Sequence, residues 1–114
     1  MSKGDQILRA HATISSLRTN VPNEYEVEEA WVREFNGALG KIEAALDMNL
    51  EEFKVGRDAL SRSVATSNYV TDEVTYRDGL WCRRENLLHK IDSVLVYFTG
   101  LQGGQDRHIG FRQP

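Results

Sequence analysis

Cysteine is almost absent from this chain of 114 residues, because Cys82 is its only one. A single cysteine excludes an intrachain disulfide framework and any zinc or iron–sulfur site built from several cysteines. A thiol without a partner in its own chain fits a reducing compartment, so we expect a cytoplasmic protein. A disulfide that joins two copies of the chain through Cys82 is the alternative. We predict no cofactor.

Long apolar runs are also missing. The longest, Val94–Phe98, is far shorter than the roughly 20 residues that span a bilayer. No apolar segment follows Lys3 of the kind that a secretory signal needs. The sequence therefore predicts no membrane partner.

Phosphate-binding and nucleophile motifs are absent too. The chain has neither the P-loop nor the dinucleotide-binding glycine pattern, and no serine stands in a nucleophile elbow. The net charge is -3, which disfavours a protein that tracks a phosphate backbone. Nucleic acid is not an expected partner.

Helical periodicity is the strongest pattern present. Apolar residues recur every three or four positions over about Lys3–Thr19, Tyr25–Leu46 and Gly79–Phe98. Pro22 ends the first stretch, and Asn23 is the expected N-cap of the second. We predict a mainly α protein, an antiparallel three-helix bundle whose core comes from the second and third helices.

The segment from about 47 to 78 lacks this periodicity. Tyr69–Thr71 and Val74–Tyr76 are β-prone triplets that favour a small hairpin, although the Asp72-Glu73 pair between them makes a poor tight turn. Thr75 and Asp78 resemble a capping box for the third helix. Because long unstructured loops are rare in compact domains, we expect this irregular or hairpin-bearing segment to pack against the helices.

We predict a single helical domain over residues 1–99, closed by a helix stop at Gly100. Residues 100–114, which hold four of the nine glycines, are expected to form a flexible or partner-docking tail. Ile109 and Phe111 are its candidate docking residues.

The second predicted helix carries most of the negative charge. Residues 23–52 contain nine acidic and two basic side chains. This is typical of a solvated face, and it also suits docking of a basic partner. Gly37 and Gly40 indicate either a close helix crossing or glycines that the helix merely tolerates.

One sector of the third predicted helix collects possible metal ligands: Cys82, Glu85, His89, Asp92 and Ser93. A single ion would reach only one adjacent pair, such as Glu85 with His89. Amphipathicity alone accounts for the pattern, so we predict no metal site. Arg83 and Arg84 favour a reactive thiolate at Cys82, yet a packing role is the preferred interpretation.

Arg84 and His89, with four residues between them, form a short motif that resembles the signature of the HEPN family of small α-helical proteins. The resemblance implies a dimeric, metal-independent ribonuclease in which these two side chains act on RNA across a subunit cleft. The chain departs from the family pattern in having Glu85, rather than a small polar residue, after the arginine. On a regular helix Arg84 and His89 lie 140° apart, with Arg84 inside the apolar stripe.

A charge within an apolar stripe needs a partner. We expect Arg84 to pair with an acidic residue such as Glu34, or to face a subunit boundary or ligand. A short three-helix core also leaves apolar surface uncovered, which favours a homodimer. The interface candidates are Trp81, Val96, Tyr97 and Phe98.

The preferred interpretation of the sequence is a small non-catalytic interaction protein, which self-associates or binds another protein through its helix faces. The alternative is the ribonuclease built on Arg84 and His89.

Overall fold

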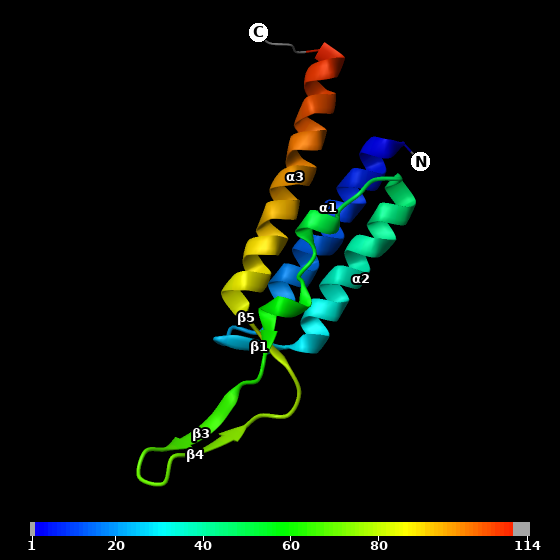
Figure 1. The fold of residues 1–114 in the computed structure, drawn as a ribbon. Helices are drawn as coiled ribbons and strands as arrows, with labels where there is room; N and C mark the ends of the chain where they lie inside the picture. The colour runs from blue at the N-terminus through cyan, green and yellow to red at the C-terminus, as the bar shows by residue number, and fades with distance from the viewer. Residues whose placement is uncertain (1, 111–114) are drawn as a thin grey trace.

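The computed structural model of the protein describes residues 2–110, with side chains to residue 102. Helices dominate this part of the chain, so the mainly α prediction is confirmed (Figure 1). The elements follow one another as α1 (Lys3–Asn20), β1 (Glu26–Glu28), α2 (Glu29–Leu46), η1 (Glu51–Phe53), η2 (Arg57–Ala59), β2 (Leu60–Ser61), β3 (Val64–Asn68), β4 (Glu73–Tyr76), β5 (Trp81–Arg83) and α3 (Arg84–Gly110).

The first helix lies where its periodicity predicts it. The hydroxyl of Ser2 caps it by accepting the N–H of Asp5 at 3.1 Å. The N–H of Val21 donates to the Arg18 carbonyl at the other end, and Pro22 prevents another turn. Helix α1 therefore begins and ends on local signals.

The other two helices begin later than predicted, because the residues before each helix form strands of a small antiparallel sheet. Val27 pairs with Cys82, so α2 begins at Glu29 and Asn23 is not its N-cap. Strand β5 occupies 81–83 at the centre of the strand order β1-β5-β2, so α3 begins at Arg84 and the predicted start at Gly79 is wrong. Strands of this length are too short to show a period of two.

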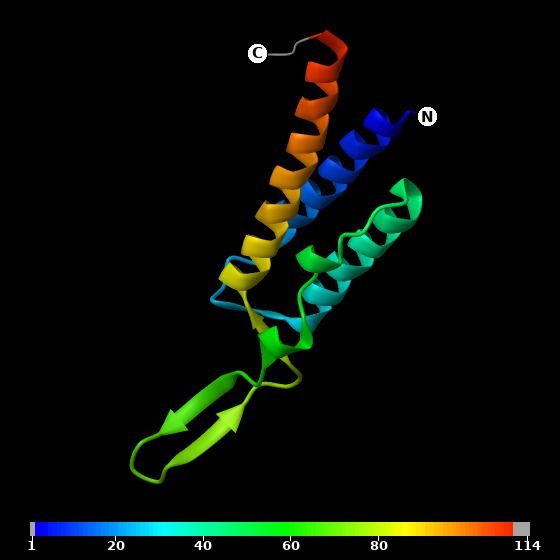
Figure 2. The same ribbon diagram turned by 45° about the horizontal axis from the view of Figure 1, so that its top comes forward.

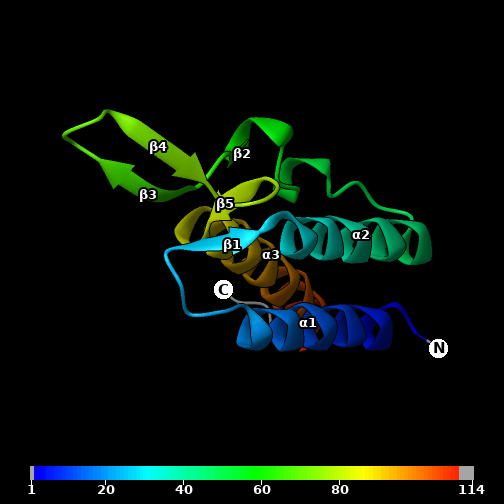
Figure 3. The ribbon, with the colours of Figure 1, turned by 90° about the horizontal axis from the view of Figure 1, so that it is seen from below.

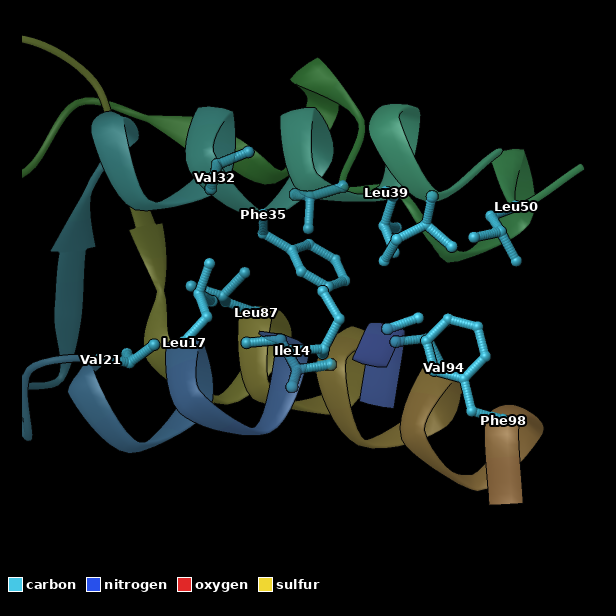
Figure 4. Packing of buried hydrophobic residues seen from close by; sticks show 14 of the residues in the cluster. Ile14, Leu17, Val21, Val32, Phe35, Leu39, Leu50, Leu87, Val94 and Phe98 are labelled. Atoms are coloured by element: carbon cyan, nitrogen blue, oxygen red, sulfur yellow. The ribbon is translucent and has the colours of Figure 1, made fainter. Parts of the chain in front are cut away.

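Both α2 and α3 leave this sheet in the same direction, and α1 runs opposite to them and packs on each (Figures 1 and 2). Their apolar stripes meet in one core, in which Ile14, Phe35 and Phe98 are completely buried (Figure 4). Gly37 and Gly40 do not mark a close crossing, because a Cβ added at either would meet nothing within 4 Å.

Residues 47–59 run back along α2 and seal its open side against α3, with Leu50 fully buried (Figure 4). The amide of Asn36 holds Val55 in the manner of a strand, accepting its N–H and donating to its carbonyl, both at 2.9 Å. Glu43 accepts the N–H of Leu50 at 2.7 Å and Lys54 Nζ at 2.8 Å. This half of the 47–78 segment covers the helices, as expected.

The other half does the opposite. Strands β3 and β4 form a hairpin, residues 64–76, that points away from the helices (Figures 1 and 2). We name it the arm, and the expectation that this part packs on the helices is wrong. Its loop spans 69–72 rather than a two-residue turn, which lets Asp72 alone take a positive φ of 59°. Thr75 lies in β4 and caps no helix.

Helix α3 continues through Gly100, so the predicted stop there is not observed. The side chains of 103–110, including Ile109, and all of 111–114, including Phe111, lie outside the described residues, so the proposed tail docking is not tested. No helix in the described part of the chain is both long and apolar enough to traverse a bilayer.

Candidate functional site

Arg84 and His89 line the same hollow at the base of α3. This hollow has a volume of about 510 Å³, and α3 together with the α1–β1 loop contributes Asn23, Glu24, Tyr25, Arg84, Glu85, Leu88, His89 and Asp92. A regular helix separates the two positions by 140°, but Arg84 is the first residue of α3 and its side chain turns toward the loop. The two members of the motif are thus brought to one place.

The Arg84 guanidinium is held by backbone rather than by a carboxylate. Its Nε donates to the Pro22 carbonyl at 2.9 Å, and the Arg84 N–H donates to the Tyr25 carbonyl at 3.0 Å. The expected partner Glu34 instead lines a groove between α1 and α2. Arg84 therefore links the α1–β1 loop to α3 through these two hydrogen bonds.

Carboxylates outnumber cations in the hollow. Glu24, Glu85 and Asp92 line it, against the single guanidinium of Arg84. Asp92 also accepts Arg18 Nε at 2.5 Å, and this hydrogen bond raises the pKa of Arg18. Glu85 is likewise paired with Arg83, Oε1 to Nη1 at 3.3 Å, so arginines beside the hollow balance two of its three carboxylates.

Cys82 is fully buried on β5 rather than exposed on a helix face. Its Sγ donates to the Arg83 carbonyl, and burial raises the pKa of the thiol despite a hydrogen bond from the Leu87 backbone. The structure therefore separates Cys82 from the row of Glu85, His89 and Asp92. Among the residues it describes, no three metal-ligating side chains come together.

The four interface candidates divide between core and surface. Trp81 is 8% exposed, with its indole N–H donated to the Asp78 carbonyl, and Phe98 is fully buried. Val96 is 71% exposed, and the Tyr97 ring packs on that of Phe53 with ring centres 5.2 Å apart and planes tilted by 34°. Of the four, only Val96 and Tyr97 have side chains exposed on the surface.

The arm exposes apolar side chains without burying any. At its tip, residues 68–73, Tyr69 is 93% and Val70 is 94% exposed. Along one face of the hairpin, Val64 opposes Tyr76, and Val74 lies on the same side of β4. The two β-prone triplets in the sequence predicted a hairpin here, but only Val74–Tyr76 lies in a strand, whereas Tyr69–Thr71 belongs to the loop. Packing of this hairpin on the helices was expected, not its exposure.

Residues of α1 and α2, two helices that lie side by side (Figure 3), line a groove of about 1080 Å³. Small residues line it, among them Thr13, Ser16, Gly37, Ala38 and Ala45. Arg9, Arg33, Lys41 and Glu34 also line it. The side chains that line the groove are therefore three cations and one carboxylate, a net charge of +2. Arg33 is also ion-paired with Glu29 outside the lining, Nη1 to Oε1 at 3.7 Å.

Comparison of the chain with protein-family models, with curated proteins and with solved structures finds no significant match in any of the three.

Proposed function

We propose that this protein is a small non-catalytic interaction protein whose arm is the docking element. The helices serve as a rigid base, an antiparallel three-helix bundle that holds the arm at one end. The observation that carries the proposal is the exposure of Tyr69 and Val70, 93% and 94%, on a hairpin whose residues 64–76 are all exposed.

Physical reasoning supports a binding role for such an element. A two-stranded hairpin standing alone in water is only marginally stable, and it offers unpaired strand edges to other chains. Exposed apolar side chains on it contribute nothing to the core. Their burial against a partner supplies the free energy that the isolated arm lacks, at about 25 cal/mol per Å² of apolar area.

The base of the arm is built to hold its direction. Ser63 is buried and donates its hydroxyl to Glu26 at 2.6 Å. The guanidinium of Arg62 stacks on Tyr76 at 3.6 Å, and that of Arg77 on Trp81 at 3.5 Å. These contacts present the arm in one orientation, which lowers the entropic cost of docking.

We place the protein in the cytoplasm, which the buried free thiol of Cys82 supports.

Photocrosslinking in the cells that make the protein tests the docking role. A benzophenone amino acid replaces Tyr69 in one version and Tyr25 in another, since Tyr25 is also exposed, at 67%, but lies at the hollow. We expect protein adducts from position 69 and none from position 25. No adduct from position 69, or equal adducts from both, would refute the arm as the docking element.

A ribonuclease is the second candidate function, because Arg84 and His89 line one hollow. We rank it lower, since the Arg84 Nε already donates to the Pro22 carbonyl and three carboxylates line the hollow with it. The purified protein is incubated with RNA beside Arg84→Ala and His89→Ala variants. Cleavage that both variants abolish without unfolding would establish the enzyme, whereas no cleavage by the unaltered protein would exclude it.

A further inference from the structure

We propose that the tip of the arm docks in the α1–α2 groove of a second copy of this chain. The inference rests on the proposed docking role of the arm and goes beyond it by naming the partner. Two copies that exchange arms reciprocally form a closed two-fold dimer.

Charge complementarity is the first argument. The tip carries Asp72 and Glu73 and no basic residue, so its net charge is -2. Of the charged side chains lining the groove, Arg9, Arg33 and Lys41 outweigh Glu34, which leaves +2. Both sets are solvent-exposed, so opposite charges attract before contact and fix the register on docking.

Shape is the second argument. Two side chains at the tip, Tyr69 and Val70, are almost fully exposed to solvent. The small side chains of the groove, Gly37 and Ala38 among them, leave the space that a bulky residue can fill. The groove is open to solvent and has a volume of about 1080 Å³.

The arm of the same copy does not reach this groove. The arm leaves the sheet in the direction opposite to that of α2 and α3 (Figures 1 and 2). The groove is lined by residues of α1 and α2, and these helices lie on the other side of the sheet. An arm tip found in the groove therefore belongs to a neighbour.

Sedimentation equilibrium at low salt, where charge pairs are least screened, tests the proposal. The tip variant combines Asp72→Asn, which tolerates the positive φ at that position, with Glu73→Lys. The groove variant combines Arg33→Glu with Lys41→Glu. In a dimer of either variant with itself, the tip and the groove carry net charges of the same sign. In a mixed dimer of the two variants, every tip faces a groove of opposite net charge.

We expect the unaltered chain to rise from its 13.0 kDa mass toward a dimer as its concentration increases. The dimer of each variant alone should have a dissociation constant at least about tenfold higher than that of the unaltered chain. The mixture should recover dimers. A matched control, Lys3→Glu with Arg57→Glu, makes the same charge change outside the groove and should self-associate like the unaltered chain.

A chain that stays at 13.0 kDa at every concentration would overturn self-docking. So would self-association that neither variant weakens, because the contact would then lie elsewhere, for example at Val96. If position 69 crosslinks only to other proteins while the chain stays monomeric, self-docking fails and the docking role of the arm stands. If position 69 yields no adduct at all, the proposed function fails as well.

Discussion

The arm and the helical base should be energetically independent, and the backbone at the foot of the arm allows a sharp test. The N–H of Arg77 donates to the Ser63 carbonyl at 2.8 Å. A hydrogen bond of the same kind joins the carbonyl of the first residue of a β-turn to the N–H of the fourth. Replacing residues 64–76 by an Asn-Gly dipeptide therefore removes the whole arm while keeping both ends in place, since Asn-Gly favours the tight turn of a two-residue hairpin.

The expected change in the free energy of unfolding is small and follows from burial. Every residue removed is exposed, so no core contact is lost. The connection between β2 and β5 shortens from the 19 residues of 62–80 to eight. This lowers its closure cost by about 0.8 kcal/mol. We expect stability between unchanged and about 1 kcal/mol higher.

Urea unfolding followed by circular dichroism measures this difference. The matched control is Phe35→Ala, which empties a fully buried site and should lower the free energy of unfolding by about 3–5 kcal/mol. A loss of more than about 2 kcal/mol on removing the arm would refute the reasoning, because such a loss requires contacts with the core.

Three single positions probe other contacts. The hydrogen bond from Lys54, followed by the one from the Leu50 N–H, lowers the Glu43 pKa below its usual 4.5. The stabilisation by Glu43 is therefore present above that pH and is lost as the pH falls through the folded-state pKa. Glu43→Gln should accordingly reduce the urea midpoint at pH 7 but not in strong acid, and an equal reduction at both would contradict this. Cys82 should react with a chromogenic disulfide reagent on the order of a hundredfold more slowly in the folded than in the unfolded protein, and equal rates would disprove its burial. Gly40→Ala should raise the free energy of unfolding by about 0.5–1 kcal/mol in urea titrations, since an added Cβ meets nothing within 4 Å, whereas a fall would reveal a close helix contact.

Local periodicity predicted much of the buried faces of the helices, although on α2 it favoured Trp31 where the structure buries Val32. Ile14, Leu87 and Ile91 are completely buried at the positions that a 3.6-residue repeat assigns to them. The end of α1 could also be predicted, because Pro22 acts on its immediate neighbours. Each of these features depends on residues within one or two turns of each other, which a single sequence displays.

The tertiary structure alone decided where α2 and α3 begin and what surrounds Arg84. Strands β1 and β5 exist because Val27 meets Cys82 across the fold, and three residues carry no period that announces such a pairing. The Arg84 side chain turns away from the apolar stripe because its Nε donates to the Pro22 carbonyl. The composition of residues 64–76 suits a hairpin, but only its distance from every helix leaves it exposed as the arm. Which face a segment buries is local information, whereas what covers that face is set by residues distant in the chain.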